Sequence, residues 1–158
     1  MKIKLGLIVC LLVSGVLHAQ KPVTVECSVG EGVGTTIQLF GVDKGEKKVL
    51  ASASYNQNGY YGFSFIPKYE GFYVVGDGRL YEYPLYLKAG DAVSLFMDKD
   101  TVYLTGKHNT AENKVLYEWV NLSKRVCEKS TYFMRVRNST YEDFFPDFEA
   151  LVAKTESF

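Results

Sequence analysis

Short strand-like segments recur along residues 21–108, and this regular spacing constrains the fold more than any other feature of the sequence. The segment at 23–29 alternates apolar with polar residues, which is the period of a strand that buries one face. Asn58-Gly59 predicts a tight hairpin, because both central residues of such a turn need positive φ angles. The predicted strands are 23–29, 36–42, 49–55, 60–66, 72–75, 80–87, 93–97 and 102–105.

No helical interval separates these segments, which argues against a parallel sheet built from βαβ units. About eight short strands with turn signals between them are typical of an antiparallel β-sandwich or barrel. We therefore predict a mainly β fold for this part of the chain. The residues expected in its core are Val25, Leu39, Phe63, Phe65, Val93, Leu95 and Leu104.

The pattern changes at Asn109, and a C-terminal helical segment is predicted from there. Asn109 with Glu112 three residues later matches a capping box, and apolar residues then recur at helical spacing. A second helix is predicted from Thr140, where Pro146 should delay the start or kink the helix. Its apolar stripe consists of Phe144, Phe145, Phe148, Leu151 and Val152. No stop signal follows this stripe, so we expect the natural reading frame to continue past Phe158.

The N-terminus has the layout of a secretory signal sequence. Lys2 and Lys4 precede an apolar run at 5–13, and Ala19 supplies the small residue at the expected cleavage site. The run is shorter than the roughly 20 residues that a membrane-spanning helix needs. We therefore expect an exported protein of the periplasm or cell envelope, with no membrane span after cleavage. The chain divides into a signal sequence at 1–19, a β-rich domain at 20–108 and a helical segment at 109–158.

The charge balance argues against a nucleic-acid partner. After cleavage the chain carries 16 basic and 18 acidic residues, and it has no long run of like charges. Nucleic-acid binding requires a concentrated basic face, which a balanced sequence of this kind does not predict.

Two cysteines, Cys27 and Cys127, remain after cleavage, in a compartment where disulfides persist. The sequence leaves two alternatives open for them, a single bridge or two buried free thiols. Thioredoxin-type exchange needs an activated thiolate with a resolving cysteine close by, and the mature chain has no C-x-x-C pair. We therefore predict that this pair is not catalytic.

No other set of residues has the pattern of an active site. The alternating glycines at 30–34 lead into a strand and lack the spacing of a phosphate-binding loop. Asp98 and Asp100 are not followed by the glycine and glutamate of a calcium loop. His108 is the one histidine left after cleavage, and the sequence offers it no ligand cluster or catalytic partner. The sequence thus predicts a protein that is not an enzyme and that has no cofactor or metal.

Tyrosines crowd the central strands and are the remaining candidate for function. If they are exposed, they would provide a stacking surface for a glycan or a contact surface for a protein. If they are half buried, they are ordinary strand formers on a pleated face. The candidate partner or ligand face consists of Tyr60, Tyr73, Tyr81 and Tyr83.

Three segments occur in an order that matches a known arrangement. The sequences NGYYGFSF at 58–65 and EGFY at 70–73 resemble a D-G-x-F-x-F … P-G-x-Y stretch. YLKAGDAV at 86–93 is similar to Y-L-x-P-G-D-x-I, with alanine in place of the proline. VYLTG at 102–106, followed by Asn109 and a helix, is similar to a V-x-G-S-x-x-N exit into helices. Together these segments resemble the DUF4369-type N-terminal domain of TlpA/ResA-like thiol-disulfide oxidoreductases, over roughly residues 23 to 125.

The resemblance implies a β domain that precedes a helical linker and then a thioredoxin-like domain in an exported protein. This sequence ends before any such domain, so no catalytic residue is carried over. The resulting hypothesis is a non-catalytic accessory module that positions a redox domain in cis or contacts its protein clients. The alternative is a stand-alone periplasmic or surface β-sandwich that binds a glycan or a protein through its tyrosine-rich face.

Overall fold

The computed structural model describes residues 21–31, 33–56, 59–79, 81–99, 101–135 and 141–156. Side chains are described in these ranges except at 131–135 and 141–143. Several sequence-based predictions therefore lie outside the described residues. They concern the signal sequence at 1–19, Gly32, Asn58, Leu80, Asp100 and Thr140.

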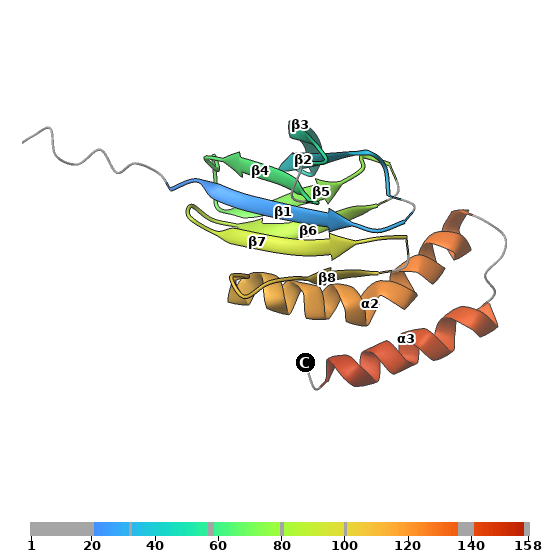
Figure 1. The fold of residues 1–158 in the computed structure, drawn as a ribbon. Helices are drawn as coiled ribbons and strands as arrows, with labels where there is room; N and C mark the ends of the chain where they lie inside the picture. The colour runs from blue at the N-terminus through green and yellow to red at the C-terminus, as the bar shows by residue number, and fades with distance from the viewer. Residues whose placement is uncertain are drawn as a thin grey trace, which may run out of the picture.

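Eight strands form two four-stranded sheets that pack face to face (Figure 1). The first sheet has the order β4-β1-β7-β8, with bounds β4 (Tyr61–Phe65), β1 (Val23–Val29), β7 (Ala92–Met97) and β8 (Val102–Leu104). The second has the order β3-β2-β5-β6, with bounds β3 (Glu46–Ser54), β2 (Thr36–Asp43), β5 (Gly71–Gly76) and β6 (Glu82–Leu87). The predicted mainly β sandwich is thus confirmed, and each predicted strand overlaps one of these eight.

One strand pair departs from the predicted antiparallel arrangement. β1 and β7 are parallel, with Thr24 opposite Ala92 and Val29 opposite Met97, whereas the other neighbouring strands pair antiparallel. Parallel strands need a long crossover connection. Here the connection runs through β2 to β6, most of which belongs to the opposite sheet, so β7 returns beside β1 in the same direction.

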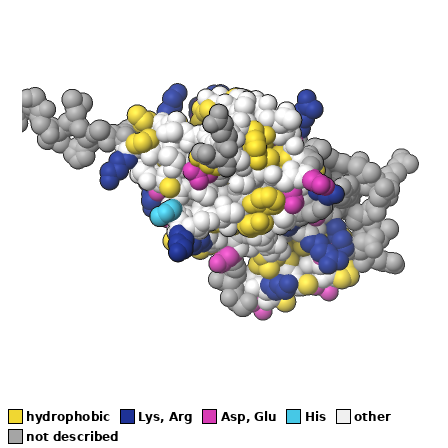
Figure 2. Space-filling model, in the orientation of Figure 1, with side chains coloured by type: hydrophobic (Ala, Val, Ile, Leu, Met, Phe, Trp, Pro, Cys, Tyr) yellow, Lys and Arg dark blue, Asp and Glu magenta, His cyan; other side chains and the backbone are white. Residues whose placement is uncertain are grey.

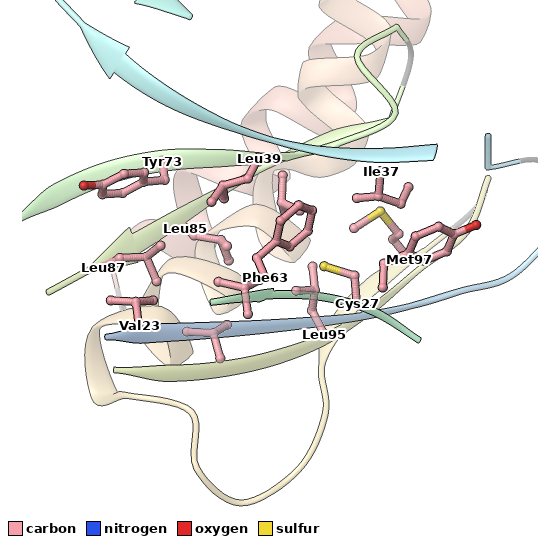
Figure 3. Packing of buried hydrophobic residues seen from close by; sticks show 14 of the residues in the cluster. Val23, Cys27, Ile37, Leu39, Phe63, Tyr73, Leu85, Leu87, Leu95 and Met97 are labelled. Carbon is pink, nitrogen blue, oxygen red and sulfur yellow. The ribbon is translucent and has the colours of Figure 1, made fainter. Parts of the chain in front are cut away.

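The core lies between the two sheets, as Figure 3 shows. Of the predicted core residues, five are buried and two, Phe65 and Leu104, are partly buried against the cluster. The five buried ones are Val25, Leu39, Phe63, Val93 and Leu95.

On the outer face of the first sheet, which faces the viewer in Figure 2, hydrophobic side chains form separate small groups.

Helix α2 (Ala111–Arg135) runs along the open side of the sandwich, next to β6 and β8 (Figure 1). Tyr117 enters the core from this helix, and Leu116 and Val120 pack against the core cluster. Burial removes these apolar groups from water and so fixes the helix on the strands. The helical segment therefore completes the core of the sandwich.

The start of α2 differs from the predicted capping box. The backbone N–H of Asn113 donates to Oγ1 of Thr110 over 3.3 Å, so Thr110 is the N-cap. The predicted cap, Asn109, instead accepts a 2.9 Å hydrogen bond from the N–H of Ser94 and donates to the carbonyl of Thr105. The prediction was wrong because an asparagine side chain can bind a neighbouring strand as well as its own helix.

Helix α3 (Tyr141–Thr155) packs against α2 and lies beyond it from the sheets in Figure 1. Pro146 lies within this helix, so it does not delay the helix start. Asp147 makes ion pairs with Lys129 and Arg125 of α2, the latter over 3.0 Å. These ion pairs, between one carboxylate of α3 and two cations of α2, thus hold the two helices together.

Acidification should loosen α3 from α2. The hydrogen bond from Lys129 and the charge of Arg125 hold the pKa of Asp147 below its ordinary value. A carboxyl whose pKa is lowered by folding stabilises the folded state above its unfolded pKa, and this contribution is lost as the pH falls through the folded pKa. Hydrogen-exchange protection of α3 should therefore stay unchanged from pH 7 to about pH 5 and drop only as the pH falls below about 4, the ordinary pKa of an aspartate.

Two variants separate this ion cluster from general acid effects. Asp147→Asn should give low protection of α3 already at pH 7, whereas Glu149→Gln, at an exposed position of the same helix, should behave like the wild type. Full protection in Asp147→Asn at pH 7 would contradict the prediction.

Candidate functional site

An elongated groove lies between the second sheet and α2. Its apolar end has a cavity volume of about 420 Å³ and is lined by Phe72, Tyr86, Glu112, Val115, Leu116 and Trp119. Its mixed end, of about 670 Å³, shares Phe72, Leu116 and Trp119 and continues past Tyr83 to Cys127. The shared residues make the two ends one continuous surface, called here the aromatic groove.

The sheet wall of the groove is formed by β5 and β6. Phe72 of β5 pairs in register with Tyr86 of β6, and their rings meet edge to face with centroids 5.5 Å apart. Phe72 is 53% exposed although it stands on a strand. The wall extends along β6 through Pro84, whose side chain also lines the groove. This wall therefore presents large apolar side chains to solvent.

The helix wall is formed by one face of α2. Leu116, Trp119, Ser123 and Cys127 are spaced by three or four residues, which places them on the same side of the helix. Trp119 is the single tryptophan of the chain and is 42% exposed. Because Trp119 and Phe72 line the same cavity from opposite sides, the groove has an exposed aromatic side chain on each wall.

Asn113 fixes the distance between the two walls. Its fully buried side-chain amide accepts from the N–H of Tyr86 over 2.9 Å and donates to the carbonyl of Tyr86 over 2.7 Å. The same amide contacts Oγ1 of Thr110 over 2.9 Å. Since Asn113 binds backbone groups on the free side of β6, the helix is attached to the strand at one defined register.

The same side of β6 cannot easily accept another strand. Pro84 lies two residues before Tyr86, so its backbone faces the same side, and proline has no N–H to donate. Asn113 already occupies both backbone groups of Tyr86. The groove is therefore suited to binding through side chains and not to strand addition at this edge.

The carboxylates that line the groove are paired with lysines within the protein, and Lys99 is a further, exposed charged residue of the mixed end. Lys88 binds Glu112 over 2.7 Å, which lowers the pKa of Glu112 and raises that of Lys88. Lys47 pairs with Glu82 across the second sheet. Lys124 and Glu128 are 3.7 Å apart, one helical turn from each other. These pairs leave the groove close to electrically balanced.

The tyrosines predicted from the sequence do not form one face. Tyr81 and Tyr83 line the mixed end of the groove, as a ligand site would require. Tyr73 is only 1% exposed and packs in the core, so its assignment to a ligand face was wrong. Tyr60 is half buried beside the turn that connects β3 to β4, where its N–H donates to Asn56, and it is not among the residues that line the groove.

The error at Tyr73 has a physical cause. Its ring stacks on Tyr69 and meets Phe65 edge to face, while its hydroxyl donates to the carbonyl of Tyr69 over 2.9 Å. A tyrosine with a satisfied hydroxyl can be buried like a phenylalanine. Phe72 and Trp119 also line the groove, although the sequence pattern predicts them only as members of a strand and a helix.

The two cysteines among the described residues form no disulfide with each other: Cys27 lies in the core and Cys127 is exposed on α2. The bridge that the sequence left open is absent, and the alternative of two buried thiols holds for Cys27 alone. Burial raises the pKa of the Cys27 thiol, which disfavours the reactive thiolate. Within the described ranges, no three side chains of His, Cys, Asp or Glu are grouped as metal ligands, and His108 is exposed.

Comparison with known proteins does not show the family of this chain. No family model matches the chain, and no curated protein matches it. One matching solved structure is a candidate cell adhesion protein from Bacteroides fragilis, with 16% sequence identity and a TM-score of 0.29. The match covers 58% of this chain and 45% of that protein, and at this level it carries no argument about function. Neither described helix has a run apolar enough to cross a bilayer.

Proposed function

We propose that this chain is a non-catalytic binding module of an exported protein and that the aromatic groove holds its partner. The observation that carries the proposal is the pair of exposed rings, Phe72 and Trp119, on opposite walls of one cavity. Large apolar side chains grouped at the surface usually mark an interaction site. A buried amide, that of Asn113, holds the walls in place before any partner arrives.

The free energy gained by covering the two exposed rings indicates how much of the groove a partner must fill. The exposed parts of Phe72 and Trp119 amount to about 200 Å², given that aromatic side chains can bury 150–250 Å² each. Covering them would contribute about 5 kcal/mol at 25 cal/mol per Å². Association itself costs about 4–15 kcal/mol. A partner that binds usefully must therefore also contact the mixed end.

The sequence resemblance supports a finer proposal about the partner. In a TlpA-like protein, the groove would receive a segment of the thioredoxin-like domain in cis or of a client. Residues of the resembling motifs have defined roles here: Gly59 and Gly90 adopt positive φ angles, and Asp91 accepts from the N–H of Lys88 in the turn between β6 and β7. These roles support a likeness in fold-determining residues.

Parallel glycan and peptide arrays test the proposed function. The wild type should bind members of one array, and Trp119→Ala and Phe72→Ala should each weaken that binding by at least about tenfold, or about 1.4 kcal/mol. Tyr103→Ala is the matched control, since Tyr103 is an exposed aromatic residue of β8 (46%) that does not line the groove. Equal binding by the groove variants and the control, or no binding to either array, would refute the groove as the site.

A further inference from the structure

We infer that the occupant of the aromatic groove is an uncharged polypeptide segment that inserts one bulky apolar side chain into the apolar end. This inference rests on the proposed function and specifies its ligand. Three observations support the inference: the groups that line each end of the groove, the pairing of the surrounding charges, and the edge of β6 that cannot accept another strand. A glycan, a fatty acyl chain and an added β-strand each fit one or more of these features less well.

The apolar end offers few hydrogen-bonding groups to a ligand. Glu112, the one charged residue lining it, is bound by Lys88 over 2.7 Å. The hydroxyl of Tyr86 donates to Oε1 of Glu70 over 3.1 Å. A sugar has hydroxyls on its rim, and burying them without partners costs free energy. A large aliphatic or aromatic side chain has no hydrogen bonds to water to lose there, and it gains contact with Leu116.

The mixed end suits the backbone that would carry such a side chain. Tyr81 and Tyr83 line it, and their hydroxyl groups can donate to and accept from peptide groups. Ser123 also lines this end, but its hydroxyl already donates to the carbonyl of Trp119 over 2.8 Å. A tyrosine phenol is a neutral donor at pH 7, since its ordinary pKa is about 10, and burial, followed by the charge of Asp98, raises the pKa of Tyr83 further. A fatty acyl chain would cover these hydroxyl groups without giving them a hydrogen-bond partner.

Charge and geometry restrict the segment further. Because Glu112, Glu82 and Glu128 each have a lysine partner within the protein, a charged segment would gain little and would have to displace an ion pair. Pro84 and Asn113 prevent the segment from extending the second sheet along β6. Side-chain insertion is then the mode of binding that the groove permits.

A selection from random heptapeptides displayed on phage tests the inference. The domain would be the bait, and phage that also bind Trp119→Ala would be removed. Enriched peptides should share one Leu, Ile, Met, Phe or Tyr position and should lack charge next to it. A consensus built on Lys, Arg, Asp or Glu would overturn the inference.

The fluorescence of Trp119 reports on occupancy, because the chain has no other tryptophan. A synthetic tryptophan-free peptide with the consensus should shift the emission saturably, and replacing its apolar residue by alanine should weaken binding at least tenfold. Phe72→Ala in the protein should have a similar effect, and Tyr103→Ala should have none. Chitotriose and laurate are the comparison probes and should leave the emission unchanged.

The outcomes separate the inference from the proposed function. A saturable response to chitotriose or laurate, with no selected peptide, would overturn the polypeptide assignment and leave the groove as a binding site. No enrichment and no response to any probe would overturn both.

Discussion

Replacing Phe63 by alanine should lower the free energy of unfolding by about 3–5 kcal/mol, the usual range for a buried phenylalanine. Phe63 lies on β4 opposite Val25 of β1 and is only 7% exposed in the core between the sheets. Its removal would take apolar groups out of the core and leave a cavity between the sheets that the surrounding side chains fill only in part. Since domains are stable by about 5–15 kcal/mol, the variant would lose a large part of its stability. Urea melts followed by circular dichroism measure the change.

Phe72→Ala is the matched control for this experiment. The same chemical groups are removed, but Phe72 is 53% exposed on the outer face of the second sheet, so the loss should be below about 1 kcal/mol, as for most surface changes. Equal losses at the two positions, or a loss near zero for Phe63→Ala, would show that the facing of β4 is misassigned.

Replacing Asn113 by alanine should lower the free energy of unfolding by about 2–6 kcal/mol, because two backbone groups of Tyr86 lose their partner and each orphaned group costs about 1–3 kcal/mol. The variant should also open the groove, since the amide is what attaches α2 to β6. We expect the emission of Trp119 to move toward the red as the indole becomes more exposed. Chemical denaturation and tryptophan fluorescence on the same samples would measure both effects.

Two further variants distinguish the hydrogen bonds from the helix itself. Asn113→Asp keeps the acceptor for the N–H of Tyr86 but places a carboxylate oxygen against its carbonyl, so it should be nearly as destabilising as alanine. Lys114→Ala changes the exposed neighbour in the helix and should be close to neutral. An Asn113→Ala protein as stable as Lys114→Ala would show that α2 is held by apolar contacts alone.

Local sequence determined the strands and turns. Alternation over 23–29 was enough to predict β1, because a strand with one buried face repeats every two residues. Gly59 has a positive φ angle, as the turn signal required, but the predicted hairpin was wrong, because β3 and β4 belong to different sheets and do not pair with each other. Gly90 marks the turn between β6 and β7. The two helices followed from the change to helical spacing near Asn109. Each of these signals acts within about ten residues, so neighbours in the chain specify it.

Tertiary contacts decided the roles of particular polar and aromatic residues. Asn109 could cap its helix or bind a strand, and the position of Ser94 beside it selected the second role. Tyr73 could face solvent or the core, and Tyr69 and Phe65 enclosed it. In both cases the residue type permits two environments, and which one it occupies depends on elements that lie next to it in the folded chain.

The sequence by itself determined a strand-rich domain followed by helices, since the periodicity of apolar residues is a property of neighbouring positions. The direction of β7 beside β1 and the aromatic groove were decided only by the tertiary structure. The groove exists because Asn113 attaches one face of α2 to β6, which brings Trp119 and Phe72, 47 positions apart in the chain, to the same cavity. No local sequence pattern predicts that two residues so far apart will meet, because the free energy of this contact is gained only when the helix and the sheet pack together.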